Sequence, residues 1–127
     1  MASLTANEKK LDAIFSKWVR YSAANKQNVV RCYTCGQLGE PQNFHCSHYI
    51  DRTHKATRWS EINCKAACVK CNTFMEGNKD EFALHLIKDY GEGILETLNK
   101  QKWTPVKIDD LQIMALIKEY KEKINAL

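Results

Sequence analysis

Residues 32–71 read CYTCGQLGEPQNFHCSHYIDRTHKATRWSEINCKAACVKC and both begin and end with a Cys-x-x-Cys pair. Two thiolates at this spacing reach one ion from a single tight turn, and two such pairs complete a tetrahedral zinc site. The sequence therefore predicts a structural Zn²⁺. Its ligands would be Cys32, Cys35, Cys68 and Cys71.

The 32 residues between the two pairs exceed the spacer of a minimal zinc ribbon, so we expect an inserted unit there. Residues Phe44–Ile50 favour a strand, and Ile62–Ala67 is its candidate hairpin partner across a polar loop. Cys68 should lead into a short helix through Phe74, which Gly77 interrupts or ends. The predicted order is strand, loop, strand, helix.

An amphipathic helix is predicted before this unit, over about residues 5–24. Thr5 and Glu8 form a capping-box pair at its start. Its apolar side chains recur at helical spacing and either enter the core or form an interface. This stripe consists of Leu11, Ile14, Phe15 and Trp18.

Further helices are predicted after the unit, over about residues 79–127. Asn78, with Glu81 three positions later, is the candidate cap of a helix that runs through Tyr90. A shorter helical segment is expected near residues 94–98.

The last predicted helix begins after Asp109 or Asp110, either of which can cap it. We expect its apolar stripe to pack with the N-terminal helix over the central unit, which is too thin to fold alone; dimerisation is the alternative. The stripe consists of Ile113, Leu116, Ile117, Tyr120 and Ile124.

The length of 127 residues, 44% of them hydrophobic, supports one modest core and therefore one domain. The fold class we expect is α+β: a zinc-pinned core over about residues 29–77 with helices on both sides. No apolar run approaches the ~20 residues that span a bilayer, and no secretory signal is apparent. We expect a soluble, cytoplasmic protein without a membrane partner, whose remaining cysteines, Cys46 and Cys64, are packed free thiols.

Positive charge is concentrated in the first half of the chain. Residues 1–60 contain nine Lys or Arg against four Asp or Glu, whereas residues 61–127 contain ten against eleven. A surplus between residues 45 and 70 suits contact with DNA phosphates, although an ordinary solvated face is the alternative. The candidate DNA-binding residues are Arg52, Lys55, Arg58, Lys65 and Lys70, of which the two arginines would contact phosphate or brace the loop.

The run HCSHYIDRTHKATRWSEINCKAACVKCNTFMEGN, residues 45–78, resembles the zinc-containing branch of the HNH, or ββα-metal, nucleases. More narrowly, its TRW…N…C-x-x-C-N…GN ending and the preceding WVRYSAANKQNVVRCYTCG resemble the NinG, or Rap, recombination proteins of lambdoid phages, and more distantly phage endonuclease VII. This resemblance covers about residues 11–90 and implies a zinc-pinned ββα-metal (HNH) core. A phage-encoded protein would act in the cytoplasm of its host.

The resemblance also implies roles for three residues. His48 matches the general base, Asn63 matches the asparagine that pins the hairpin loop, and Asn72 matches the ligand of a catalytic metal ion. Imidazole is a competent base at neutral pH, and Mg²⁺ or Mn²⁺ accepts an amide oxygen while keeping several waters. Zinc would then be the scaffold, and Mg²⁺ or Mn²⁺ the catalyst.

One position departs from the family pattern, because Ser47 stands where many members place an aspartate before the base histidine. His45 is the first candidate for a second metal ligand. Asp51, His54, Glu76 or water molecules are the other candidates.

The function that the resemblance implies is metal-dependent hydrolysis of DNA, at branched substrates such as Holliday junctions during phage recombination. Two paired incisions would favour a homodimer. Two alternatives remain: a sequence-tolerant nicking or restriction-type HNH nuclease, and a non-catalytic zinc-ribbon DNA-binding module.

Overall fold

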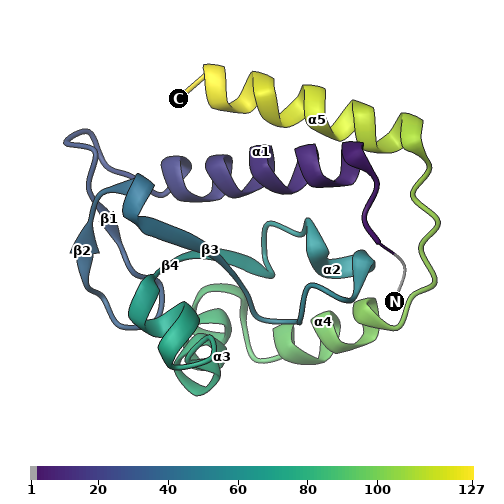
Figure 1. Cartoon of the computed structure of the whole chain (residues 1–127). Coiled ribbons are helices and arrows are strands. Elements are labelled where there is room, and N and C mark those ends of the chain that lie inside the picture. The colour runs from purple at the N-terminus through teal and green to yellow at the C-terminus, as the bar shows by residue number, and fades with distance from the viewer. Residues whose placement is uncertain (1–2) are drawn as a thin grey trace.

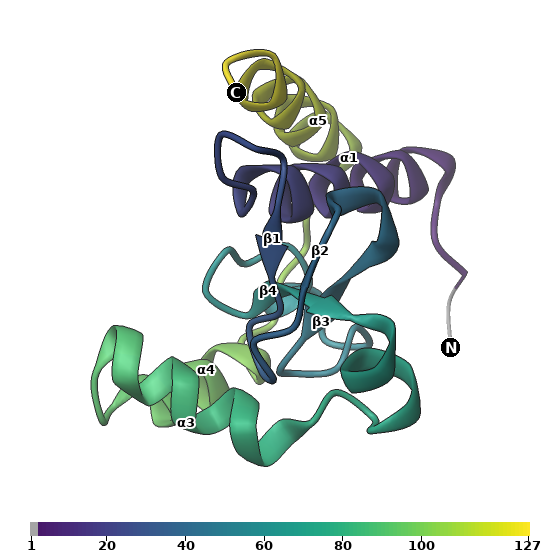
Figure 2. The same ribbon diagram turned by 90° about the vertical axis from the view of Figure 1, so that its left-hand side faces the viewer.

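The computed structural model describes residues 3–127 and has a mixed α+β fold (Figure 1). A short β-hairpin lies between two helical layers, one above and one below it in Figures 1 and 2. The upper layer contains α1 (Ala6–Ser22) and α5 (Asp110–Asn125); the lower layer contains α3 (Lys79–Tyr90) and α4 (Ile94–Lys102). Two antiparallel pairs of strands are present, β1 (Val30–Arg31) with β2 (Leu38–Gly39), and β3 (Phe44–His48) with β4 (Cys64–Cys68). A short 3-10 helix, Pro41–Asn43, precedes β3.

The upper layer forms because α1 and α5 bury their apolar stripes against each other. Both helices start with a capping box, Thr5 with Glu8 and Asp109 with Gln112, so Asp109 is the cap of α5. Phe15 and Tyr120 meet edge to face with their ring centroids 5.0 Å apart. The stripes at the two ends of the chain therefore build a shared core. Its buried residues are Leu11, Phe15, Val19, Cys64, Ile113, Ile117 and Tyr120.

The hairpin β3–β4 pairs Phe44 with Cys68 at one end and His48 with Cys64 at the other. Both strands differ from the predicted ranges, because β3 ends at His48 and β4 begins at Cys64. The cause is Asn63, whose side chain bonds the backbone N–H and carbonyl of Ile50 at 2.7 and 3.1 Å. These two groups are thus unavailable to extend the strand pairing.

The segments around the hairpin differ in detail from the prediction. The polar loop contains a short helix, α2 (Lys55–Arg58). The short helix predicted through Phe74 is present as a π-helical segment, η2 (Lys70–Phe74). The predicted side-chain cap at Asn78 is wrong. Asn78 adopts a left-handed conformation, with φ of 48°, and its amide donates to the Cys71 sulfur at 3.6 Å instead of bonding the first turn of α3. α4 is also longer than the segment expected near residues 94–98.

The lower layer has its own apolar cluster, which anchors the loop after β3. Ile50 packs there with side chains of α3 and α4, so the end of β3 is tied to both helices. The buried members are Ile50, Phe82, Leu86, Ile94 and Leu98. Among residues 3–127, no helix combines the length and apolar character needed to cross a membrane.

Candidate functional site

The four paired cysteines converge on one point. Their sulfur atoms all lie within 4.8 Å of one another, and the Cys35 and Cys68 sulfurs are 3.7 Å apart. β1 and β2 present the first pair, whereas the end of β4 and the start of η2 present the second. The chain thus has a four-cysteine cluster that could hold a metal ion such as zinc. Its members are Cys32, Cys35, Cys68 and Cys71.

Hydrogen bonds from neighbouring groups point at these sulfurs. The backbone N–H of Cys68 donates to the Cys32 sulfur at 3.3 Å, and that of Gln37 donates to the Cys35 sulfur at 3.4 Å. Such donors stabilise thiolates, the form in which cysteine binds zinc. Burial opposes a charge on Cys32, but bonds from Thr34 and from backbone N–H groups outweigh it and lower the pKa of this thiol to about 6.

The Cys35 and Cys68 sulfurs need a cation to become thiolates together. Burial, and bonds shared with the other three sulfurs, raise the pKa of Cys35 to about 12. Burial also raises the pKa of Cys68. A bound divalent ion reverses this preference because it neutralises several thiolates at once. The donor set, four sulfurs in a closed and largely buried cluster, therefore fits a structural Zn²⁺.

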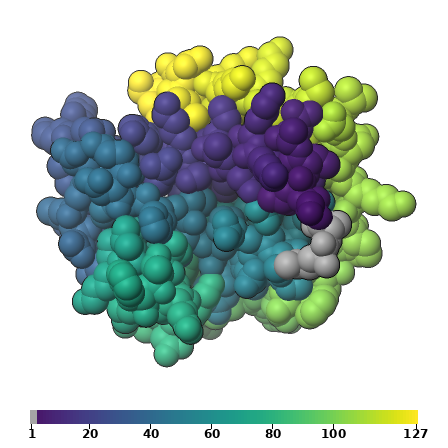
Figure 3. Space-filling model, viewed as in Figure 1, coloured from purple at the N-terminus to yellow at the C-terminus, as the bar shows by residue number. Residues whose placement is uncertain are grey.

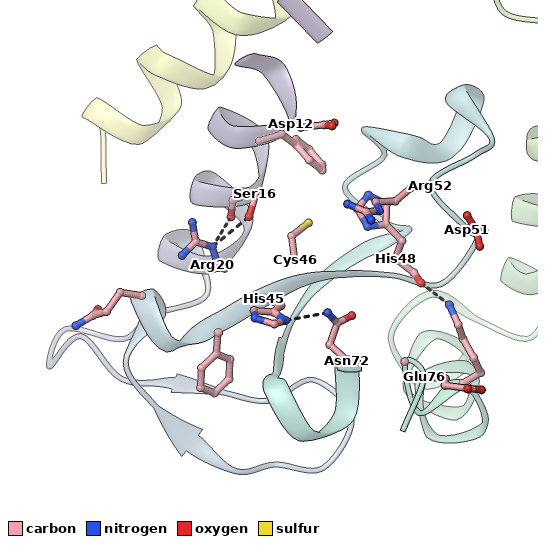
Figure 4. A pocket seen from close by; sticks show the side chains of 15 residues that line it. Asp12, Ser16, Arg20, His45, Cys46, His48, Asp51, Arg52, Asn72 and Glu76 are labelled. Carbon is pink, nitrogen blue, oxygen red and sulfur yellow. Dashed lines mark hydrogen bonds between the residues drawn. The ribbon is translucent and has the colours of Figure 1, made fainter. Parts of the chain in front are cut away.

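A cavity of about 760 Å³ includes Asn72, the residue after Cys71, in its lining. It is visible in Figure 3 as the recess between α1 and the segment that contains η2. Its lining comes from α1, from β3 and the loop after it, from η2 and from the start of α3. Figure 4 shows the side chains, including His45, His48, Asn72 and Glu76. Two residues predicted to act together, His48 and Asn72, thus line the same cavity.

His48 is held in a defined orientation by the loop backbone. Its Nε2 lies 2.9 Å from the carbonyl oxygen of Arg58. Because a carbonyl only accepts hydrogen bonds, Nε2 carries the proton of the neutral ring, and Nδ1 keeps a free lone pair. Burial lowers the pKa of His48, despite the opposing bond to Arg58, so the ring is neutral at pH 7. A neutral imidazole with one free lone pair can accept a proton.

The residue that supplies this carbonyl, Arg58, is itself held in place by a residue of α1. The Arg58 guanidinium bonds both oxygens of Asp12, at 2.9 and 2.5 Å, and donates to the carbonyl of Arg52 at 2.7 Å. Trp59 also donates to Asp12, at 2.9 Å. Arg58 is only 8% exposed, so its contacts correspond to the bracing alternative rather than to a phosphate contact.

On the other side of the hairpin, Lys79 holds the backbone of the same histidine. Its ammonium donates to the carbonyls of His48 and Tyr49, the latter at 2.6 Å. Lys79 is the first residue of α3, so the lower helical layer also fixes the end of β3. His48 is therefore held at two points: the loop carbonyl of Arg58 contacts its side chain, and Lys79 of α3 bonds its backbone carbonyl.

Asn63 fixes the loop between His48 and Arg58. Its side chain is fully buried and makes three bonds, two to Ile50 and one to the carbonyl of Thr57 at 3.0 Å. All of its partners are backbone groups of the loop. Asn63 is thus placed where it sets the path of the chain that leads to the Arg58 carbonyl.

We predict that Asn63→Ala lowers the free energy of unfolding by about 3 kcal/mol or more, because each buried group left without a partner costs roughly 1–3 kcal/mol. Urea denaturation followed by circular dichroism measures this loss. Asn99→Ala, at an exposed position of α4, is the matched control and should change stability by less than about 0.5 kcal/mol. Equal stability of the two variants would contradict the role of Asn63.

Asn72 lies on η2, directly after a ligand of the four-cysteine cluster, and contacts His45. Its Nδ2 lies 2.9 Å from Nδ1 of His45 (Figure 4). The amide oxygen is at the opposite end of the group and has no hydrogen-bond partner among residues 3–127. This oxygen is therefore free to bind a cation. Nδ1 of the exposed His45 accepts the hydrogen bond from Asn72, so Nε2 carries the proton of the neutral ring.

Of the other candidate metal ligands, two line the cavity and one does not. Asp51 and Glu76 line the cavity, and hydrogen bonds from Thr53 hold the pKa of Asp51 below its usual value. His54 instead lies against Trp103, with ring centroids 5.4 Å apart, and does not line the cavity.

Ser47 is fully buried, and its Oγ has no hydrogen-bond partner among the residues described. Because side chains alternate along a strand, Ser47 points away from the face of β3 that carries Cys46 and His48. Ser47 does not line the cavity. The acidic residues that do are Asp12 from α1, Asp51 from the loop after β3, and Glu76 after η2.

The five candidate DNA-binding residues do not form one continuous face. Arg52 lines the cavity and is exposed, and Lys70 is exposed on η2. Lys55 pairs with Glu8 at 2.6 Å, and Arg58 is buried in its brace. Lys65 lies elsewhere, in a cavity of about 320 Å³ lined by Trp18 and Tyr90.

Sequence reasoning missed Asp12, Arg20 and Lys79, all of which line the cavity. Arg20 bonds Ser16 and the carbonyl of Pro41, at 3.1 to 3.2 Å. No local pattern marks these residues, because each acts on a segment distant in the sequence. The one available signal was an acidic residue, Asp12, beside the apolar stripe of the first helix.

In a comparison with protein families, the family described as the bacteriophage lambda NinG protein matches residues 2–127. No curated protein and no solved structure matches the chain. The family match extends beyond the residues 11–90 covered by the resemblance and includes α5.

Proposed function

The chain belongs to the NinG family, and on this premise we propose that it is a metal-dependent DNA endonuclease of the zinc-containing HNH, or ββα-metal, class. The observation that supports the proposal most is the placement of His48. This half-buried, neutral imidazole has a lone pair free, and it shares a cavity with the amide oxygen of Asn72, which no described residue bonds.

In the proposed reaction, His48 is the general base. Its Nδ1 accepts a proton from a water molecule, the resulting hydroxide attacks phosphorus, and the bond to the leaving oxygen of the neighbouring nucleotide breaks. The Arg58 carbonyl keeps the proton on Nε2 throughout, so that Nδ1 is the nitrogen that accepts. The bond between Asp12 and Arg58 prevents this carbonyl from turning away.

The oxygen of Asn72 would be the first ligand of a hard cation such as Mg²⁺ or Mn²⁺, and His45, Asp51 and Glu76, which line the same cavity, are the candidates for a second ligand. When bound, such an ion neutralises charge on the phosphoryl and leaving oxygens. The four-cysteine cluster would fix Asn72, since Cys71 precedes it and the Cys71 carbonyl accepts from Gly77 at 2.9 Å.

The proposed substrate is branched DNA, such as a Holliday junction, during phage recombination. A junction is resolved by two incisions, so we propose a homodimer with two sites. Light scattering measures the mass in solution. Cleavage of junction, flap and linear duplex, compared at equal concentration, separates a resolvase from a sequence-tolerant nicking or restriction-type nuclease.

The first experiment is incubation of the purified, zinc-loaded chain with supercoiled plasmid in Mg²⁺, in Mn²⁺ and in neither. We expect nicked and linear products only when one of the two ions is present, because the cavity groups are suited to a hard cation. Gel electrophoresis detects both products.

A protein that retards DNA on a gel but produces no product in either ion would instead be a zinc-stabilised DNA-binding module. This outcome would contradict the endonuclease proposal. Cleavage that is equally fast without added Mg²⁺ or Mn²⁺ would contradict the assignment of Asn72 as a ligand of the catalytic ion.

A further inference from the structure

A second group of metal-binding atoms lies beside the proposed base. The sulfurs of Cys46 and Cys64 and a ring nitrogen of His48 are all within 4.8 Å of one another. The hairpin register explains this arrangement. Cys46 and His48 share one face of β3, and Cys64 is directly opposite His48 on β4.

The three residues are held in place by the surrounding structure. Cys64 is 2% exposed and donates to the Arg58 carbonyl at 3.4 Å, the same oxygen that contacts His48. Cys46 and His48 both line the large cavity. One ligand is therefore fixed in the core, and two are reachable from the cavity, as Figure 4 shows for Cys46 and His48.

We propose that Cys46, His48 and Cys64 form a second, thiophilic metal site, which binds Zn²⁺ and thereby blocks His48. Two thiolates and an imidazole select soft or borderline ions such as Zn²⁺, whereas Mg²⁺ prefers oxygen ligands. On binding, the two thiols release their protons to solvent. The fourth position of a tetrahedral ion would face the cavity and take a water molecule.

Zinc in this site is expected to inhibit cleavage. A neutral imidazole that binds the ion through one nitrogen carries its proton on the other, so no lone pair is left to accept a proton from water. The two thiolates also cancel the charge of the ion, so the bound zinc does not attract a DNA phosphate and does not offset the loss of the base. This inhibition rests on the proposed endonuclease function. The binding of zinc does not, and it has its own readout.

The two zinc sites should fill at different free zinc concentrations. The four-cysteine cluster offers four thiolates, whereas the second site offers two thiolates and one imidazole. The reduced, full-length protein is equilibrated with zinc buffered at a low and at a high free concentration, and bound zinc is measured by mass spectrometry of the metal. We expect one ion per chain at low free zinc and two at high free zinc.

Variants locate the second ion. Cys46→Ser and Cys64→Ser should each bind one zinc at both concentrations, while Ser47→Ala, a neighbouring position without a ligand, should still bind two. Co²⁺ added to wild-type protein that already holds zinc in the four-cysteine cluster gives a check that needs no variant. A thiolate charge-transfer band and the visible spectrum of tetrahedral Co²⁺ are expected.

Cleavage in Mg²⁺ provides the second readout. High free zinc should slow wild-type cleavage at least about tenfold, since a general base contributes about 10²–10⁴-fold to the rate. A return to low free zinc should restore it. Cys64→Ser, compared with its own rate at low zinc, should be slowed less than about twofold, because it lacks a ligand of the inhibitory site.

Several results would overturn the proposal. The second site would be contradicted if the wild type bound only one zinc per chain at high free zinc. It would also be contradicted if both cysteine variants still bound a second zinc. Two bound zinc ions with unchanged or faster cleavage would remove the inhibition. If the wild type cleaves in no buffer, the endonuclease proposal fails, while the zinc count still decides whether the second site exists.

Discussion

His48→Ala is expected to reduce DNA cleavage in Mg²⁺ or Mn²⁺ by about 10²–10⁴-fold, the usual contribution of a general base. The variant should fold normally, because the imidazole is only partly buried and its hydrogen-bond partner, the Arg58 carbonyl, also accepts from Cys64. Binding of DNA should persist, since the charge of the protein at neutral pH is unchanged.

The measurement is the rate of plasmid cleavage under single-turnover conditions, with circular dichroism and gel retardation as checks on fold and binding. His85→Ala is the matched control: His85 lies on α3, half exposed, and faces Glu81 rather than the cavity. Its rate should equal that of the wild type. If His48→Ala cleaves as fast as His85→Ala, His48 has no part in the mechanism.

The pH dependence of the wild type gives a second test of the same assignment. The base acts in its neutral form, so the rate falls when the pH drops through the His48 pKa. Burial lowers that pKa, so the acidic half-point of kcat/KM should lie below about 6.5, the ordinary histidine value. A half-point clearly above that value would contradict a buried base.

Cys71→Ser is expected to cost at least about 5 kcal/mol of stability, a large part of the total for a domain of this size. The serine hydroxyl is a poor zinc ligand, and the four-cysteine cluster is continuous with a buried group of apolar residues from the hairpin and the first cysteine pair. Cleavage should be lost too, because η2 carries Asn72. The measurements are bound zinc and the urea midpoint of unfolding.

Cys46→Ser, compared at low free zinc, is the control for this substitution. Cys46 lies outside the four-cysteine cluster, and its replacement should cost less than about 1 kcal/mol. Removal of zinc from the wild type by a chelator should lower its stability and abolish its cleavage, as Cys71→Ser does. Adding zinc and then Mg²⁺ should restore cleavage, whereas adding Mg²⁺ alone should not. A Cys71→Ser protein with wild-type zinc content and midpoint would contradict the scaffold role.

Local patterns predicted much of this fold. The Cys-x-x-Cys spacing identified four residues whose sulfurs do meet, and the capping pair of Thr5 and Glu8 marked the start of α1. Such features depend on residues a few positions apart, whose geometry is fixed by a single turn. Prediction was therefore good where the interaction is short in sequence.

Prediction failed where a side chain bonds a group outside its own turn or run instead of playing the role that the local sequence indicates. Asn78 has the sequence of a helix cap, but the Cys71 sulfur binds its amide, and its backbone is left-handed. Arg58 belongs to a basic run, yet Asp12, 46 positions earlier, holds it inside the protein. The partner of Arg58 cannot be identified from spacing, because the contact exists only after α1 has packed on the loop. The partner of Asn78 is seven positions away and follows no helical or strand period.

The bond between Asp12 and Arg58 also limits how far the protein can be shortened from its N-terminus. A fragment starting near the first cysteine would keep both cysteine pairs, the hairpin and the base. It would lack the carboxylate that holds the loop, and a buried guanidinium would lose its counter-charge. We therefore expect that the proposed site needs the N-terminal helix and, because α5 packs against α1, the C-terminal helix as well.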